Sequence, residues 1–469
     1  MVATTSPWIH QLDPLRKHVS LEEDIPTEVV IIGAGIAGLS SAFFTLKNTS
    51  KKVVMVEAYK IAHGATGHNA GQIVSYFEHP FAHLVELYGA QKAARAQEEI
   101  YYAWDLLDEM YTEADIQAPL SRFTGYAGCS SVEQIVEHLE NIRAQREAGL
   151  DIEGVLVASV PYILNKIPDI YRELYARIDH KEVMNLLETN DVRYIGVLAS
   201  KKGCVNSALL CEQLSAYLLR RYAGRFSLYE HSPVTEVILE KNKGLVVVGK
   251  HTIVAERIVL CTNGFSRFTI KNSFGNDINS RFHSSVMGKI GYMAAYLEPS
   301  GKPPVAISYF TPPQSSQIKA YDRSKPPEDQ DPYIYLTRRL FDHKTEGRRN
   351  LICVGGPESD VDPRNGYQSE HHEYPQTAQT EITTFLKKSF RSFPAGKNNF
   401  AFTWHGLMGY TPSGVRCIGP DPENPVLLYN LGCNGVGILS SIYGGRRISS
   451  FLLHHKLEPS IFDPERSLF

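Results

Sequence analysis

The stretch Glu28-Val29-Val30-Ile31-Ile32-Gly33-Ala34-Gly35-Ile36-Ala37-Gly38 decides the fold of this chain. Its first five residues are mostly β-branched and apolar, as expected for a strand buried on both faces. Leu39 to Leu46 continue at helical spacing, and Val53 to Val56 form a second apolar run that ends in Glu57. This strand–turn–helix–strand unit predicts a Rossmann-type dinucleotide-binding fold.

Each glycine of this fingerprint has a separate expected task. Gly33 permits the tight turn after the strand, Gly35 lets the backbone approach a pyrophosphate, and Gly38 lets helix and strand pack closely. The pyrophosphate would lie at the helix N-terminus, where free N–H groups and the helix dipole favour anions. Glu57, followed by Ala58, is placed to accept hydrogen bonds from an adenosine ribose.

Composition narrows the class of protein. The 469 residues are 43% hydrophobic, enough for two or three domain-sized units. Acidic and basic residues nearly balance, 51 against 48, without a Lys/Arg block, so nucleic acid is not an expected partner. The seven scattered cysteines indicate reduced thiols. We find neither a signal-peptide pattern nor an apolar run long enough for a membrane helix, and expect a cytoplasmic protein.

A second loop of small residues, soon after Glu57, extends the expected cofactor site. It reads Gly64-Ala65-Thr66-Gly67-His68-Asn69-Ala70-Gly71-Gln72. It resembles the G-A-S-G-R-N-x-G loop of the D-amino-acid-oxidase-like family of FAD enzymes, which includes glycine, sarcosine and γ-glutamylputrescine oxidases. The resemblance implies that FAD is the cofactor and that this loop lies along its pyrophosphate, ribityl chain and flavin ring.

Further segments resemble the family in the same order along the chain. Val234 lies in a segment similar to the strand whose backbone meets the adenine, and Thr262-Asn263-Gly264 resembles a strand-ending turn. Trp404-His405-Gly406 and the glycine-rich turn Gly432-Cys433-Asn434-Gly435-Val436-Gly437-Ile438 resemble the C-terminal signature. N–H groups of that last turn, at a helix N-terminus, could stabilise negative charge on the reduced flavin.

The expected architecture is α/β, with a discontinuous Rossmann-type FAD-binding domain and a substrate domain built on a mixed or antiparallel sheet. We assign residues 25–90, 200–270 and 400–469 to the FAD-binding domain. Residues 91–199 and 271–399 form the substrate domain, and residues 1–24 form an N-terminal tail. Residues 81–146 are expected to be rich in helix.

The resemblance implies oxidation of a C–N bond in a small amine or amino acid, by hydride transfer to flavin N5. The imine is then hydrolysed, and O2 is commonly reduced to H2O2. Three alternatives stay open. The first is an amine dehydrogenase that uses a quinone or a protein electron acceptor, and the second is a flavin-binding regulatory or structural module with little turnover. The third is a Rossmann enzyme with nicotinamide as its main cofactor. No G-x-S-x-G elbow, P-loop or metal-ligand spacing supports another chemistry.

Candidate catalytic residues come from the sheet expected to face the flavin. They are Tyr292, Lys289, Tyr335, Arg338 and His405. Tyrosines at alternate strand positions are more often plain core than an amine cage. Arg338 could hold a substrate carboxylate or lie at the surface. Lys289 could place a cation near flavin N5, or be a solvated strand end.

Two departures from the family pattern bear on the substrate and the flavin linkage. Amino-acid oxidases of the family often carry an arginine just before the segment that here starts at Thr411, but this chain has Leu407 to Tyr410 there. That difference favours an amine, or a carboxylate held elsewhere. His68 occupies the position at which some relatives bond flavin covalently, although noncovalent FAD is the first expectation.

Overall fold

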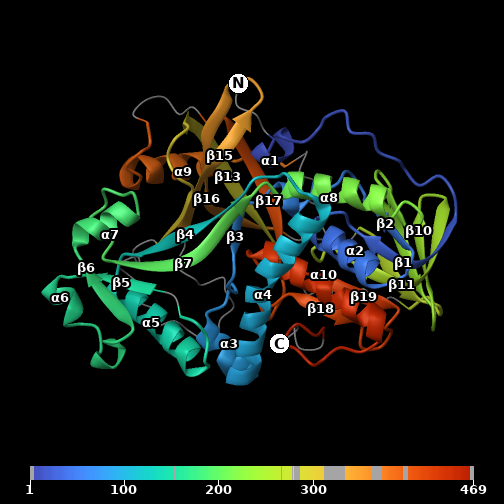
Figure 1. The fold of residues 1–469 in the computed structure, drawn as a ribbon, viewed down its shortest axis with the longest axis horizontal. Coiled ribbons are helices and arrows are strands. Elements are labelled where there is room, and N and C mark those ends of the chain that lie inside the picture. The colour runs from blue at the N-terminus through green and yellow to red at the C-terminus, as the bar shows by residue number, and fades with distance from the viewer. Residues whose placement is uncertain are drawn as a thin grey trace.

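Two β-sheets lie beside each other along the long axis of the molecule in the computed structural model, with helices between and around them (Figure 1). The structure describes residues 5–152, 154–265, 267–276, 278, 286–310, 333–361, 372–394 and 400–464. The arrangement confirms the expected α/β class with two sheets.

The first sheet has nine strands, and its main path runs in the order β12-β9-β10-β11-β1-β2-β8. Strand β1 pairs in parallel with both β11 and β2, and β19 continues the parallel set beside β11. The strands are β1 (Ile25–Ile32), β2 (Val53–Val56), β8 (Phe226–Tyr229), β9 (Val234–Leu239), β10 (Gly244–Val248), β11 (His251–Leu260), β12 (Thr269–Asn272), β18 (Cys417–Pro420) and β19 (Leu427–Leu431).

The predicted βαβ unit is present, although β1 begins at Ile25, before the expected Glu28, and α2 extends beyond the expected Leu39 to Leu46 at both ends. Strand β1 leads into α2 (Ile36–Asn48), and β2 follows in parallel at the neighbouring position. Val29 to Ile32 and all four residues of β2 are buried, which explains why both strands are apolar throughout rather than alternating.

The second sheet has ten strands and is mostly antiparallel, in the order β17-β13-β16-β15-β14-β4-β7-β5-β6, with β3 beside β7. Only its β14–β4 and β5–β6 pairs run parallel among the described strands. The strands are β3 (Gln72–Val74), β4 (Leu120–Cys129), β5 (Gly154–Ala158), β6 (Tyr175–Ile178), β7 (Gly196–Val205), β13 (Met287–Pro299), β14 (Val305–Phe310), β15 (Tyr333–His343), β16 (Gly347–Val361) and β17 (Phe402–Tyr410).

Helices cover the outer faces of both sheets and fill the space between them (Figure 1). Helix α10 packs against α2 on the first sheet, whereas α9 packs against β13 and β16 of the second. The remaining helices are α1 (Pro7–His10), α3 (Phe81–Tyr88), α4 (Ala90–Ala114), α5 (Val132–Glu147), α6 (Pro161–Leu164), α7 (His180–Leu186) and α8 (Ser207–Arg221), with α9 at Gln376–Ser389, α10 at Gly437–His454 and short 3-10 turns η1 at Ala65–Gly67 and η2 at Asp169–Tyr171.

Three features differ from the sequence-based expectation. Strand β17, assigned to the FAD-binding domain, is the edge of the second sheet, because β13 supplies its hydrogen-bonding partner. Helix α4, assigned to the substrate domain, packs on α10 and α8. The ten-residue strand β4 interrupts the region expected to be helical, since its partner β7 lies far along the chain and leaves no local signal.

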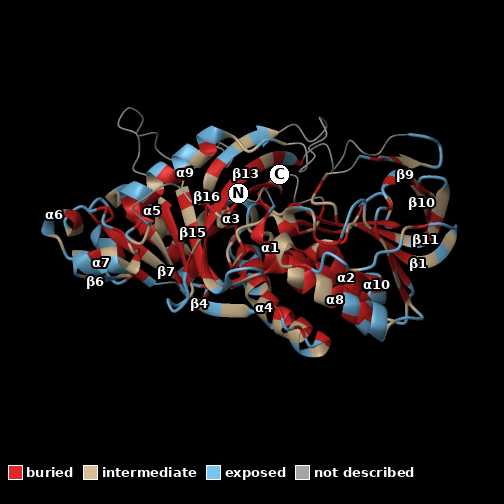
Figure 2. Cartoon of the chain, turned by 90° about the horizontal axis from the view of Figure 1, so that it is seen from above, coloured by how far each residue is buried: buried red, intermediate tan, exposed pale blue. Residues whose placement is uncertain are grey.

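One large apolar core joins the two sheets. It contains Val29 and Ile31 of β1 together with Met293 of β13 and Trp404 of β17. A second core, with Ile334 and other residues of the opposite sheet face, lies under α5 and α9. Figure 2 shows buried residues along the strands and exposed residues on the outer turns of the peripheral helices. The second sheet therefore has one face toward the first sheet and another toward α9.

No helix in the described part of the chain combines the length and the apolar character needed to cross a membrane.

Candidate active site

The fingerprint loop has the geometry that its glycines predict. Gly33 has φ +107°, and a Cβ there would lie 2.7 Å from the carbonyl oxygen of Cys261. A Cβ on Gly38 would collide with the carbonyl oxygen of Gly33. At Gly35, the N-cap of α2, an added Cβ would lie 2.9 Å from the hydroxyl oxygen of Thr66, so the second loop packs closely against this position.

Glu57 holds this loop at the end of β2. Its carboxylate accepts hydrogen bonds from the N–H groups of Ala34, at 2.8 Å, and Tyr59, at 3.0 Å. Burial raises the pKa of Glu57, and these backbone donors offset part of that shift. The described structure thus gives Glu57 a task in shaping the fingerprint turn, and its contact with a ribose stays a prediction.

The second glycine-rich loop packs against the start of α2. The hydroxyl of Thr66 accepts a hydrogen bond of 3.1 Å from the N–H of Ile36, one of the free donors of the helix N-terminus. Asn69 accepts from the N–H of Gly71 and donates to Ser207 of α8. The two loops that the sequence proposes for the cofactor therefore form one surface.

The N-terminal segment is not a loose tail. Trp8 of α1 is fully buried, and its indole donates a hydrogen bond of 2.6 Å to the carbonyl of Asn69. The hydroxyl of Ser6 donates to the carbonyl of Gly67, and Arg339 lies over the Trp8 ring. Sequence reasoning missed this contact, although a tryptophan after Ser-Pro in a polar stretch was an available signal.

The C-terminal glycine-rich turn reaches the same region. Gly432, Asn434 and Gly435 all have positive φ, and α10 begins at Gly437. The N–H of Cys433 donates a hydrogen bond to the side-chain oxygen of Asn263, and the N–H of Asn434 donates one to the carbonyl oxygen of Gly409 of β17. Three segments that are far apart in the sequence, including the turn Thr262-Asn263-Gly264, thus meet at one place.

His68 lies between the second loop and β17. Its Nδ1 is 3.0 Å from the carbonyl oxygen of Gly64, so Nδ1 carries the proton and Nε2 keeps its lone pair. Burial lowers the pKa of His68, which favours the neutral ring. A Cβ on Gly406 would lie 2.5 Å from the His68 carbonyl oxygen, so β17 passes directly over the loop.

Tyr292 and His405 lie on the sheet face that is turned away from these loops. They form a neighbouring pair of β13 and β17, within the cluster that packs against Ala378 of α9. The Tyr292 hydroxyl is 2.9 Å from both Ser359 Oγ and His372 Nε2, and His405 Nε2 donates to the His372 carbonyl. Burial lowers the pKa of His405 to about 4. The expectation that both face the flavin is therefore corrected, because strand alternation places them on the α9 side.

Arg338 is also on the far face. Its guanidinium makes two hydrogen bonds to Glu188, at 2.7 and 2.6 Å, and its Nε donates to the carbonyl of Pro303. Its side chain is 3% exposed, so it is neither a surface arginine nor available to a substrate carboxylate. Tyr335 lies three residues earlier on the same strand, so its side chain points to the opposite face, where it contacts Met293 of the shared core.

Tyr335 and Lys289 are the candidate catalytic residues on the face toward the cofactor loops. Lys289 lies over the ring of Tyr410, 5.7 Å from its centroid, and the rings of Tyr335 and Tyr333 are 5.9 Å apart. Two acids join them that sequence reasoning missed, Glu78 and Glu358. An acid within the aromatic stretch that follows the second loop was the available signal for Glu78.

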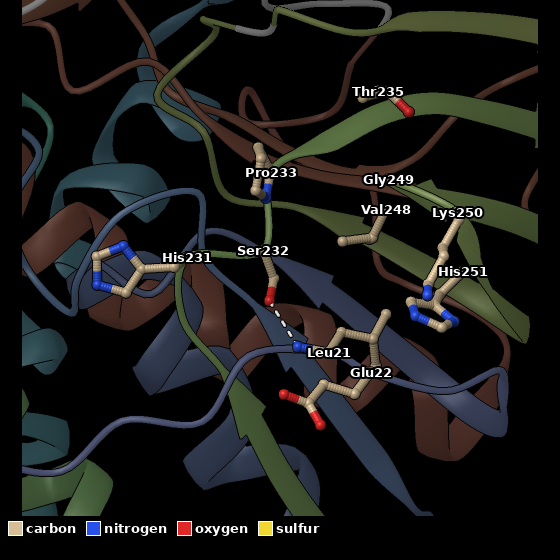
Figure 3. Close-up of a pocket in the computed structure, with 10 residues that line it drawn as sticks. All are labelled: Leu21, Glu22, His231, Ser232, Pro233, Thr235, Val248, Gly249, Lys250 and His251. Atoms are coloured by element: carbon tan, nitrogen blue, oxygen red, sulfur yellow. Dashed lines mark hydrogen bonds between the residues drawn. The ribbon is translucent and has the colours of Figure 1, made fainter.

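Val234 begins β9 at the outer part of the first sheet. Near it, a surface pocket of about 570 Å³ lies between this strand and the segment before β1 (Figure 3). Ser232 accepts a hydrogen bond from the N–H of Leu21 at its edge. None of the lining residues belongs to the two cofactor loops or the C-terminal turn, so this pocket is not the candidate substrate site.

Comparison with known proteins identifies the class. The family model described as DAO, FAD dependent oxidoreductase, matches residues 28–450. The chain therefore belongs to the DAO family of FAD-dependent oxidoreductases, and FAD is the expected cofactor. The glycine fingerprint at the N-terminus of α2 and the converging glycine-rich loops fit such a long dinucleotide.

Among curated relatives, the probable oxidoreductase OrdL of Haemophilus influenzae is 23% identical over 239 residues, which are 51% of this chain and 49% of that protein. The γ-glutamylputrescine oxidoreductase of Escherichia coli is 31% identical over 90 residues, 19% of this chain and 21% of that protein. These alignments thus span about half or less of the relatives' length.

Among solved structures, glycine oxidase from Bacillus cereus matches with a TM-score of 0.62 at 18% identity, covering 93% of this chain and 97% of that one. L-proline dehydrogenase from P. horikoshii matches with a TM-score of 0.64 at 16% identity, covering 95% and 98%. At this level of identity the likeness shows the shared fold.

Proposed function

We propose that this protein oxidises a C–N bond of a small amine with FAD as cofactor and O2 as the final acceptor. A primary amine of formula R-CH2-NH2 would react with O2 and H2O to give the aldehyde R-CHO, NH3 and H2O2. The reaction passes through an imine, which water hydrolyses. FAD, when bound, supplies the hydride acceptor at its N5 atom. The names of three similar proteins support amino compounds as the substrate class, since those proteins are named for glycine, proline and γ-glutamylputrescine.

One observation carries this proposal. A Cβ placed on Gly435, in the C-terminal turn, would lie 3.0 Å from the carboxylate of Glu78 and 3.2 Å from the hydroxyl of Tyr410. Acid and phenol groups therefore abut the turn that the family resemblance places at the flavin. A carboxylate at this position suits the positive charge of an amine.

The chain's own residues would bind, orient and shield the substrate. Gly291 and Gly406 occupy paired positions on β13 and β17, and the missing side chain at Gly406 lets the second loop approach the sheet at His68. The hydroxyl of Tyr410 lies beside Gly435 of the C-terminal turn, and the fixed N–H donors at the start of α10 are pre-oriented toward that turn. Pre-oriented groups of this kind lower the reorganisation needed during the reaction.

The seven cysteines are all free, which fits a reducing compartment such as the cytoplasm.

Oxygen uptake by the purified flavoprotein tests the proposal. The panel contains primary and secondary amines, diamines, sarcosine, glycine, and D- and L-amino acids. We expect uptake and equimolar H2O2 with at least one amine. Anaerobic bleaching of the flavin by an amine, with slow reoxidation in air, would instead identify a dehydrogenase with a quinone or protein acceptor. A flavin that no member of the panel reduces would contradict the proposal.

A further inference from the structure

A group of acidic and aromatic side chains gathers at the sheet face that is turned toward the cofactor loops. It consists of Glu78, Glu358, Tyr333, Tyr335 and Tyr410, and we call it the acid–tyrosine cage. Glu78 follows β3, and the others lie on β15, β16 and β17, so only the folded chain brings them together. The role of this cage in choosing the substrate rests on the proposed function and narrows its substrate class.

The sheet register places an acid beside two glycines. Glu358 of β16 pairs with Gly291 of β13, and Gly291 pairs in turn with Gly406 of β17. The row across three strands therefore carries one carboxylate and then two positions without side chains. A Cβ on Gly291 would meet only Met408, at 3.1 Å, whereas a Cβ on Gly406 would meet the backbone of His68, so the free space beside Glu358 lies at Gly291.

The second acid closes the cage from the side of the C-terminal turn. The carboxylate of Glu78 and the hydroxyl of Tyr410 both lie next to Gly435. Glu78 is a partly buried residue and Glu358 an exposed one. Among the described residues, neither carboxylate makes an ion pair or hydrogen bond.

The tyrosine rings complete the walls. Tyr335 is fixed by a contact of 3.1 Å between its hydroxyl and the sulfur of Met293, and Tyr333 lies beside it. Tyr410 is only 8% exposed, and its hydroxyl lies with the Glu78 carboxylate beside Gly435. Tyrosine faces attract cations through the negative face of the ring, and they do so without needing a counter-charge.

The charges of the cage act on one another. Burial and, after it, nearby Glu358 raise the pKa of Glu78 to about 7, while Lys289 acts in the opposite direction. The carboxylate of Glu78 is the largest cause that raises the pKa of Tyr333, ahead of burial. A bound cation would relieve this repulsion, whereas an added carboxylate would increase it.

Cations that could hold a carboxylate are scarce in the described part of this site. Arg416 is fully buried and uses its nitrogens on Asn430 and the carbonyl of Gly432. Arg338 is bound to Glu188 on the other face. Lys289 remains. It lies near Glu358, whose negative charge would repel a carboxylate ligand.

We propose that the acid–tyrosine cage is the substrate-selecting site and that it takes a cationic amine without a carboxylate, such as a diamine. Glu78 and Glu358 bind the ammonium group, and Tyr333, Tyr335 and Tyr410 surround it. Amino acids are disfavoured because the carboxylates of Glu78 and Glu358 repel the carboxylate of an amino acid.

Binding can be measured without turnover. The oxidised FAD-loaded protein is titrated with tetramethylammonium chloride, with sodium acetate and with sodium chloride at matched ionic strength, and the flavin absorbance is recorded. We expect a saturable change with tetramethylammonium alone. Its dissociation constant should rise about tenfold or more in Glu78→Gln and in Glu358→Gln, since each loses one carboxylate charge.

Glu346→Gln is the matched control, because Glu346 is an exposed acid at the far hairpin of the same sheet. It should leave the dissociation constant unchanged. Flavin content and melting temperature are recorded for each variant, and Glu358→Gln keeps the test decisive if Glu78→Gln fails to hold FAD. Acetate binding as tight as tetramethylammonium binding, or tetramethylammonium binding unchanged in both variants, would overturn the cage.

Anaerobic flavin reduction separates this proposal from the proposed function. We expect 1,4-diaminobutane to reduce the flavin faster than 4-aminobutanoate, which has a carboxylate in place of one ammonium. Reduction by amino acids without tetramethylammonium binding would overturn the cage and keep the amine or amino-acid oxidoreductase. If tetramethylammonium binding depends on Glu78 and Glu358 but no amine reduces the flavin, the cage proposal stands and the proposed function is contradicted.

Discussion

The indole nitrogen of Trp8 donates a hydrogen bond of 2.6 Å to the carbonyl oxygen of Asn69. This contact ties the N-terminal segment to the second cofactor loop, and Asn206 adds a bond of 3.1 Å to the Trp8 carbonyl. A Cβ on Gly71 would lie 2.7 Å from the Trp8 ring, so loop and indole are in close contact. The N-terminal segment therefore supports the loop expected to bind FAD.

Loss of the Trp8 hydrogen bond should weaken FAD binding. Trp8→Phe keeps most of the aromatic ring but removes the N–H donor. Loss of one such hydrogen bond costs about 1 kcal/mol, so the FAD dissociation constant should rise about fivefold. The measurement is fluorescence titration of the apoprotein with FAD. Trp104→Phe, on α4, is the control and should bind FAD normally. Equal affinity of Trp8→Phe and wild type would show that the contact does not support the loop.

Gly38→Ala should prevent formation of the fingerprint turn. The added methyl group would collide with the carbonyl oxygen of Gly33, at a cost of about 1–3 kcal/mol or more in folding free energy. We expect a lower melting temperature and little retained flavin after purification. Gly224→Ala is the control, because nothing lies within 4 Å of its added Cβ. A yellow Gly38→Ala protein of normal stability would contradict the close packing of helix and strand at this turn.

Cation binding should depend on pH through Glu78. Its pKa is raised to about 7, first by burial and then by Glu358. Below that pH the carboxyl is neutral and above it the group is charged, so tetramethylammonium affinity should rise as pH increases through about 7. The probe does not titrate, and Glu78→Gln should flatten the profile. An unchanged profile in this variant would assign the titration to another group.

Arg338 should contribute to stability rather than to substrate binding. Arg338→Met leaves Glu188 without its two charge-assisted hydrogen bonds, which should cost about 3 kcal/mol in folding free energy, less where solvent reaches Glu188. Denaturant unfolding measures this loss. The flavin spectrum and the ligand titrations should match those of the wild type. A selective loss of amino-acid binding at unchanged stability would restore Arg338 as a carboxylate anchor.

FAD should be released by acid denaturation. One ring nitrogen of His68 is committed to the Gly64 carbonyl, which leaves only Nε2 for a covalent bond to flavin. We expect the flavin in the supernatant after trichloroacetic acid precipitation. A yellow pellet, lost in His68→Ala, would instead identify a histidyl–flavin link.

The sequence by itself determined the local features of this protein. The apolar run of β1, the glycines at positions 33, 35 and 38, and Glu57 predict the Rossmann unit because strand, turn and helix are all encoded within about thirty residues. The second loop and the C-terminal turn were found in the same way, from short motifs in a fixed order.

Only the tertiary structure decided which side chains share the site. Tyr292 and Tyr335 were equivalent candidates in sequence, yet strand alternation and pairing place them on opposite faces of the same sheet. Glu78 and Glu358 are distant in sequence and carry no motif. Trp8 lies in a polar stretch and is buried by a loop 61 residues away. Such contacts depend on how whole elements pack, and local sequence patterns do not record that packing.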